Sequence, residues 1–175
     1  MLHRRDLYRL GTIVLGSAFS LALAIPGIRF FVDPLTKRGE DGDFRFLTRL
    51  GQLKVGEPQS FSILAERQDG WVRYPRQPVG SVWLIRQPET AKEPVIALSS
   101  ECPHLSCPVA LASGGKSFLC PCHDSVFNLD GTRKNAVSPR SMDQLEVRLI
   151  GDDDPRIEVK FLRFRPQSQE KTPLA

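Results

Sequence analysis

Cysteine and histidine are concentrated in one short stretch of this 175-residue chain. All four cysteines and two of the three histidines lie between positions 102 and 123: Cys102, His104, Cys107, Cys120, Cys122 and His123. Thiolates and imidazoles are preferred ligands of zinc, copper and iron–sulfur centres. Because residues used only as core filler would not cluster in this way, the stretch is predicted to be a metal-binding site.

Two segments each offer cysteine and histidine. The first reads CPHLSCP from Cys102, and the second reads CPCHDS from Cys120. Two thiolates and two imidazoles suit tetrahedral zinc, and they also suit a 2Fe–2S cluster with two cysteines on one iron and two histidines on the other. Spacing alone leaves both open. Cys107 and Cys122 favour the cluster, because outside the cytoplasm a bridge between them would tie the two loops together.

The N-terminus combines a basic flank with a long uncharged stretch. Residues 10–28 carry no charge, and this is long enough to span a bilayer and longer than the apolar region of a signal peptide. The arginines within residues 1–9 place that segment in the cytoplasm by the positive-inside bias, with everything after the span outside. Arg4-Arg5 partly matches a twin-arginine export signal; the alternative is an ordinary basic flank.

Two features bear on how the anchor ends. Pro26-Gly27 is expected to terminate the helix near the outer interface. Ala22-Leu23-Ala24 offers a competing cleavage site, and we expect the uncut anchor. Residues 29–43, which include the polar run GEDGD, are interpreted as a hinge or linker.

Residues 44–166 have the pattern of a β domain. Runs rich in branched and aromatic residues alternate with turn signals, at residues 44–50, 60–65, 80–86, 94–99, 117–120, 145–150 and 156–164. This predicts an all-β fold, an antiparallel β-sandwich or small barrel. Residues 68–70 are interpreted as a connection and residues 167–175 as a flexible tail. Trp71, Tyr74 and Trp83 are interpreted as packing residues rather than a ligand platform.

Composition narrows the class of protein further. Apolar residues make up 41% of the chain, charged residues 25%, and the formal net charge is +4. These values exclude global disorder, a collagen and a polytopic membrane protein. The chain has no basic block of the kind that a nucleic-acid site needs, so no nucleic-acid partner is predicted.

The two cysteine–histidine boxes closely resemble the C-T-H-x-G-C and C-P-C-H-x-S boxes of Rieske iron–sulfur proteins, of the disulfide-bearing kind found in cytochrome bc-type quinol oxidoreductases. The resemblance implies a 2Fe–2S cluster in a small subdomain at about residues 100–140. It implies Cys102 and Cys120 on the ferric-locked iron, His104 and His123 on the redox-active iron, and a disulfide between Cys107 and Cys122. It also places Leu105, Ser125, Phe127 and Pro139 beside the cluster.

The chain departs from the family pattern at four positions. Pro103 replaces a frequent Thr, and Ser106 and Asp124 replace Gly. Asp124 adds a negative charge and raises the question of the local backbone angle. Phe127 stands where respiratory members carry a Tyr whose hydroxyl bonds to a ligand sulfur, whereas Ser125 retains the hydroxyl that would bond a bridging sulfide.

The resemblance also implies a function. The chain would be the electron-transfer subunit of a quinol–cytochrome c oxidoreductase, held by one helix in the bacterial cytoplasmic membrane with its C-terminal domain on the periplasmic or outer side. Its partners would be a cytochrome b-type membrane subunit, a cytochrome c-type acceptor and a quinol, with menaquinol favoured over ubiquinol. His123 would take a proton from the quinol. The alternatives are a small subunit of another exported redox enzyme, such as arsenite oxidase, and a structural zinc module.

Overall fold

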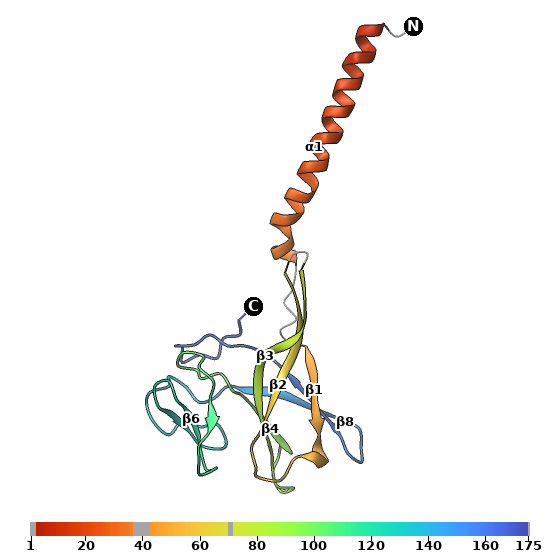
Figure 1. The fold of residues 1–175 in the computed structure, drawn as a ribbon. Helices are drawn as coiled ribbons and strands as arrows, with labels where there is room; N and C mark the ends of the chain where they lie inside the picture. The colour runs from red at the N-terminus through yellow and green to blue at the C-terminus, as the bar shows by residue number, and fades with distance from the viewer. Residues whose placement is uncertain (1–2, 37–42, 70–71, 175) are drawn as a thin grey trace. The chain divides into compact units, whose positions relative to one another are not determined.

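The computed structural model describes residues 3–36, 43–69 and 72–174 of the chain. They form two units, an N-terminal helix and a β domain, shown in Figure 1.

The N-terminal unit is the helix α1 (Arg4–Thr36). Its stretch Arg4–Asp33 is long and apolar enough to cross a membrane by length and composition. The prediction that Pro26-Gly27 ends the helix is wrong, because α1 continues for more than two turns beyond them. Proline removes one backbone hydrogen bond and its ring crowds the preceding turn, so it bends a long helix more readily than it stops it. Residues 29–36 of the predicted hinge are therefore helical, and residues 37–42 lie outside the described residues.

The β domain is built on a six-stranded sheet in the order β1-β9-β8-β4-β3-β2. Its strands are β1 (Phe44–Arg49), β2 (Gln59–Asp69), β3 (Val72–Arg86), β4 (Val95–Ser99), β8 (Gln144–Ile150) and β9 (Arg156–Lys160). The pairs β1–β9, β8–β9, β4–β8 and β3–β4 are antiparallel. A short 3-10 helix, η1 (Leu50–Gln52), follows β1. The all-β prediction is confirmed.

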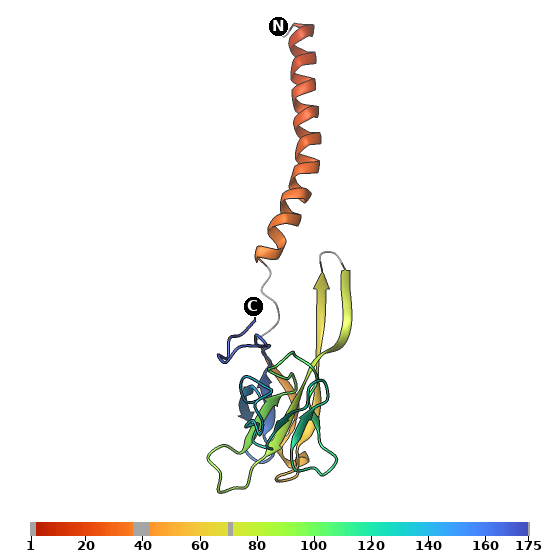
Figure 2. The same cartoon turned by 90° about the vertical axis from the view of Figure 1, so that its left-hand side faces the viewer.

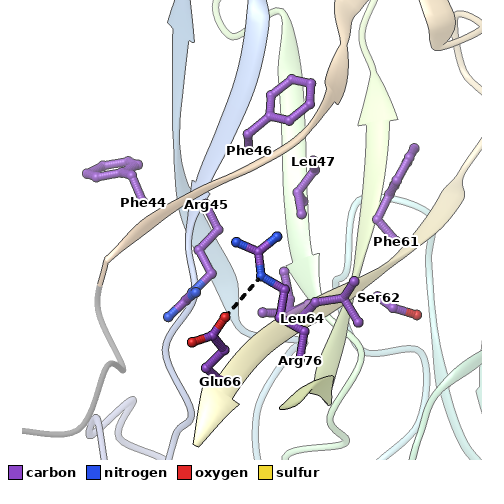
Figure 3. A pocket seen from close by; sticks show the side chains of 10 residues that line it. Phe44, Arg45, Phe46, Leu47, Phe61, Ser62, Leu64, Glu66 and Arg76 are labelled. Carbon is purple, nitrogen blue, oxygen red and sulfur yellow. Dashed lines mark ion pairs between the residues drawn. The ribbon is translucent and has the colours of Figure 1, made fainter.

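The two edge strands of this sheet, β1 and β2, border a common groove. It has a volume of about 640 Å³ and is lined by side chains from both strands, including Phe46, Phe61 and Leu64 (Figure 3). Arg76 of β3 lies 3.7 Å from Glu66 of β2 in this groove. A sheet whose first and last strands line one groove is curled nearly into a barrel.

A hairpin of β2 and β3 extends beyond the body of the domain (Figure 2). The prediction that residues 68–70 form a connection is wrong at its start, since β2 runs through Asp69. Pro75 and Pro78 lie inside β3, and proline within a run argues against a strand, which is why the extension was not predicted. Tyr74 of this hairpin is 40% exposed. Trp71 lies outside the described residues.

Two hydrophobic cores fill the β domain. The larger lies within the six-stranded sheet and is built around Leu84, Ile157 and Val159. The smaller joins that sheet to the loops that follow β4, and contains Phe118, Phe127, Cys102 and Cys120. Trp83 confirms its predicted packing role, because its ring packs 5.1 Å from that of Phe118 and its indole N–H donates to the Val109 carbonyl.

The end of the chain differs from the predicted flexible tail. Residues 163–174 fold back on themselves through hydrogen bonds from the Arg165 amide to the Thr172 carbonyl and from the Leu174 amide to the Arg163 carbonyl. They also bond to the loops between β4 and β8. Main-chain bonds of this kind leave no pattern in the sequence, since any residue except proline can donate them.

Candidate metal centre

Both cysteine–histidine boxes lie on a small subdomain inserted between β4 and β8. Its sheet consists of β5 (Ala110–Leu111), β6 (Phe118–Cys120) and β7 (Ser125–Phe127), and β5 and β7 were too short to be predicted. The second box is the turn that joins β6 to β7, with Cys120 paired directly to Ser125. The hairpin register therefore fixes where this box begins and ends.

The first box is a tight loop between β4 and β5. The Cys102 amide donates to the Cys107 carbonyl at 2.9 Å, and the Ser106 amide donates to the Cys102 carbonyl at 2.8 Å. Glu101 and Pro108 form a β-bridge at the base of the loop. These bonds hold Cys102 and Cys107 at fixed positions on either side of His104.

Two non-glycine residues of the boxes take the left-handed backbone conformation that glycine usually supplies. They are Ser106, with φ of 56°, and Asp124, with φ of 55°. Each costs roughly 1 kcal/mol relative to glycine. The Asn135 side chain supports the second turn, since its Nδ2 donates to the Asp124 carbonyl at 2.7 Å and its Oδ1 accepts from the Val126 amide. Ser106 and Asp124 thus adopt a conformation that glycine would take without this cost.

The structure contains a disulfide between Cys107 and Cys122, with their Cα atoms 6.6 Å apart. It joins the first box to the second, as the resemblance implied. Cys102 and Cys120 are free thiols and are buried. The Sγ of Cys120 lies within 4.8 Å of both disulfide sulfurs, but disulfide sulfurs are not thiolates and are not expected to ligate iron.

The two histidines of the boxes face each other. The ring centroids of His104 and His123 are 4.8 Å apart, and the rings are nearly perpendicular. His104 is half-buried, whereas His123 is exposed. The structure therefore brings together two buried thiols and two adjacent imidazoles, one of which is open to solvent.

The environment of the Cys102 thiol keeps it protonated in the absence of a metal. Burial is the main cause that raises its pKa, and the neighbouring Cys120 raises it further. The backbone N–H of His104 and the hydroxyl of Ser125 act in the opposite direction. A metal that binds here must displace the thiol proton, since the thiolate is the ligand.

The buried hydroxyl of Ser125 indicates where a bound group could accept a hydrogen bond. Its Oγ is buried and has no hydrogen-bond partner among the residues that the structure describes, although it lies near the Cys102 thiol. A buried hydroxyl without a partner is costly, and such groups commonly mark the place of an ion or cofactor. A bridging sulfide at this position would accept the bond. Together with two buried thiols and two imidazoles, this hydroxyl fits a 2Fe–2S cluster with mixed ligands.

Three further residues were predicted to lie beside the cluster: Phe127, Pro139 and Leu105. Phe127 is fully buried and pairs with Phe118 across β6 and β7, in the core that contains Cys102 and Cys120. Pro139 belongs to a loop whose carbonyls, at Ser138 and Pro139, accept bonds from Arg133 Nη1. Leu105, at the tip of the first box, is 43% exposed. Sequence reasoning missed Asn135 and Arg133, whose roles are to bond main-chain carbonyls and so carry no motif.

The fold, with two buried thiols and two adjacent imidazoles in one subdomain, fits an iron–sulfur domain. Residues 46–147 match the family described as "Rieske [2Fe-2S] domain", and the chain belongs to this family. The cofactor of that domain is the Rieske-type 2Fe–2S cluster.

Curated relatives share the family at low identity. The chain is 29% identical over 127 residues to the menaquinol:cytochrome c reductase iron-sulfur subunit of Bacillus subtilis, covering 71% of this chain and 72% of that protein. It is 27% identical to the cytochrome b6-f complex iron-sulfur subunit of Gloeobacter violaceus over 146 residues, covering 78% and 72%. Among solved structures, the plasma membrane Rieske protein of Synechocystis matches at 24% identity and a TM-score of 0.38, covering 48% of this chain and 80% of that one.

Proposed function

We propose that this chain is the Rieske subunit of a membrane-bound quinol–cytochrome c oxidoreductase. The observation that supports this most strongly is the exposed imidazole of His123 next to His104, on loops joined by a disulfide. The relatives named as subunits of menaquinol:cytochrome c reductase and cytochrome b6-f complexes support the same assignment.

Four residues would hold the cluster: Cys102, His104, Cys120 and His123. The cluster, when bound, supplies one-electron chemistry at roughly −150 to +300 mV, because two neutral imidazoles in place of thiolates make it less negative. Ser125 would donate its hydroxyl to a bridging sulfide. The disulfide, Leu105 and Pro139 would shield the site from solvent.

His123 would recognise the quinol. Its ring is exposed, so the nitrogen not engaged with the metal is free to accept a hydrogen bond from a quinol hydroxyl and to take its proton. His104 is more enclosed and would serve mainly as a ligand. The quinol would thus pass its proton to His123, because that is the imidazole it can reach.

The partners follow from this role. A cytochrome b-type subunit would present the quinol in the membrane, and a cytochrome c-type protein would accept the electron. Menaquinol is favoured as donor, because Phe127 cannot supply the hydrogen bond that a Tyr would give, which lowers the potential. The helix α1 would anchor the chain, with residues 1–9 in the cytoplasm and the β domain outside.

Purification of the full chain from membranes tests the proposal. We expect it to co-purify with b-type haem, to give an EPR signal on reduction, and to show nitrogen couplings from two histidines in pulsed EPR. An EPR-silent protein that contains zinc would contradict the cluster. A cluster with histidine couplings but without b-type haem would favour the small subunit of another exported redox enzyme, such as arsenite oxidase.

A further inference from the structure

We propose that residues 163–174 act as a clamp that fixes the first box relative to the loop containing Pro139, with Gln167 and Arg140 as positioning residues. The proposal rests on the ligand set proposed above, because the first box carries Cys102 and His104. In Figure 1 this C-terminal chain, in dark blue, lies beside the loops around β6.

One side of the clamp contacts the backbone between two proposed ligands. The amide of Gln167 donates to the carbonyl of Pro103 at 2.9 Å, and Pro103 is fully buried. Gln167 reaches this position in the left-handed conformation, with φ of 56°, while its side chain is exposed. The contact is therefore made by the main chain and needs no particular side chain at position 167.

A second contact on the same side adds an ion pair. Arg163 Nε lies 2.9 Å from Glu101 Oε1, and Glu101 immediately precedes Cys102. The clamp thus bonds the chain on both sides of Cys102, at Glu101 and at Pro103.

The other side of the clamp is held by Arg140, which follows Pro139 directly. Its Nε and Nη2 donate to the two carboxylate oxygens of Asp143 at 2.9 and 2.7 Å. Its Nη1 donates to the carbonyls of Arg165 and Ser168 at 3.0 and 2.6 Å. The guanidinium and the carboxylate are nearly buried. A two-point pair with Asp143 fixes the plane of the guanidinium, and this directs Nη1 at the clamp.

The clamp is itself closed by internal bonds. In addition to its two main-chain bonds, Phe164 and Pro173 form a β-bridge, and the Lys171 ammonium lies 4.7 Å above the Phe164 ring. A segment closed in this way transmits a displacement at one end to the other, whereas an open tail would absorb it.

Together with the clamp, two further links connect the three loops around the site in a ring. The Cys107–Cys122 disulfide joins the first box to the second, and Asn135 joins the second box to the loop that leads to Pro139. The clamp joins that loop back to the first box. We therefore infer that the spacing of Cys102 and His104 from the rest of the site depends on main-chain contacts made more than 60 residues later in sequence.

A matched pair at position 167 tests one end of the clamp. Gln167→Pro removes the amide that bonds to Pro103 and excludes the positive φ. Gln167→Gly keeps the amide and suits that φ. In the full-length protein, at a temperature below unfolding, we expect Gln167→Pro to lose its cluster about tenfold faster than the parent, as loss of a buried bond predicts, and Gln167→Gly to match the parent.

Variants of Arg140 test the other end. Arg140→Gln removes the bonds to the carbonyls, and Arg140→Lys, which cannot bond to Asp143 and both carbonyls with the same geometry, should restore only part of the effect. Arg148→Gln is the control, since Arg148 also pairs with a carboxylate, that of Glu158, but on the large sheet and away from the boxes. Arg140→Gln should shorten the cluster lifetime about tenfold, and Arg148→Gln should leave it unchanged.

Hydrogen exchange gives a readout that is independent of cluster function. In the cluster-free full chain, amides of residues 101–107 should exchange faster in Gln167→Pro and in Arg140→Gln than in the two controls. Unchanged exchange at residues 101–107 in both variants, or equal changes in the controls, would overturn the clamp. If Gln167→Pro does not fold, Arg140→Gln decides. If the proposed ligand set is wrong, the parent protein would instead lack the histidine couplings in pulsed EPR.

Discussion

Cys120 and Ser125 stand opposite each other as a pair of residues on β6 and β7. The proposed ligand Cys120 and the Ser125 hydroxyl thus occupy paired positions of one hairpin, and both side chains are buried. The hydroxyl has no hydrogen-bond partner among the described residues. A hydrogen bond from such a hydroxyl to a cluster sulfur withdraws electron density, which stabilises the reduced state and raises the potential.

Ser125→Ala should therefore lower the reduction potential. The shift expected is several tens of millivolts, because about 59 mV corresponds to a tenfold change, or ~1.4 kcal/mol, close to one net hydrogen bond. Potentiometric titration followed by EPR measures it. Ser117→Ala is the control, because Ser117 immediately precedes β6. An unchanged potential in Ser125→Ala would place the Ser125 hydroxyl away from the cluster.

The disulfide should stabilise the loops without ligating metal. Cys107→Ser or Cys122→Ser should leave a cluster that assembles but is labile and has a lower potential, since the ligands remain and the tie between loops is gone. Removing a native disulfide typically costs about 2–5 kcal/mol. Cluster lifetime and potential are measured for both single variants and the double variant. A stable cluster at unchanged potential in all three would refute this role of the bridge.

His123 should be required for quinol oxidation. His123→Cys offers the metal a ligand of another kind, but a thiolate does not take up the quinol proton as the imidazole does. We expect quinol oxidation to be abolished, even where EPR shows that some cluster has assembled and that it accepts electrons from a chemical reductant. Quinol turnover that survives in this variant would rule out the proton-accepting role.

A stability prediction follows from the packing of β3. A Cβ built at Gly80 would overlap Cζ of Phe161, in the larger core. Gly80→Ala should destabilise the domain by about 1–3 kcal/mol, because the ring must shift within a packed core. Gly114→Ala is the control, since nothing lies within 4 Å of its added Cβ. Thermal unfolding of both variants is the measurement, and equal midpoints would contradict the close contact.

The sequence predicted the features that depend on residues close to one another in the chain. The two boxes and most strands of the large sheet were visible as spacing or alternation, since a ligand set needs particular side chains at particular offsets, and the family resemblance implied the disulfide. The features it did not predict depend on contacts distant in sequence. The clamp at residues 163–174 bonds through main-chain carbonyls, and β5 and β7 become strands only because they pair with β6. α1 passes Pro26 because a single lost bond is small beside the rest of a long helix.

Position 127 offers the most direct test of what sets the potential. Phe127 is fully buried in the core that contains Cys102 and Cys120, so a hydroxyl added to its ring would enter the surroundings of the proposed ligands. Phe127→Tyr should raise the potential by several tens of millivolts, if its hydroxyl donates to a ligand sulfur as the family resemblance implies, by the same conversion of about 59 mV per tenfold change. Phe118→Tyr, on the paired strand, tests whether any buried hydroxyl in this core has the same effect. EPR-monitored titration of both variants, with unfolding curves to confirm that each remains folded, measures the shift. An unchanged potential in a folded Phe127→Tyr would mean that the ring edge points away from the cluster, and the preference for menaquinol that rests on Phe127 would then have to be abandoned.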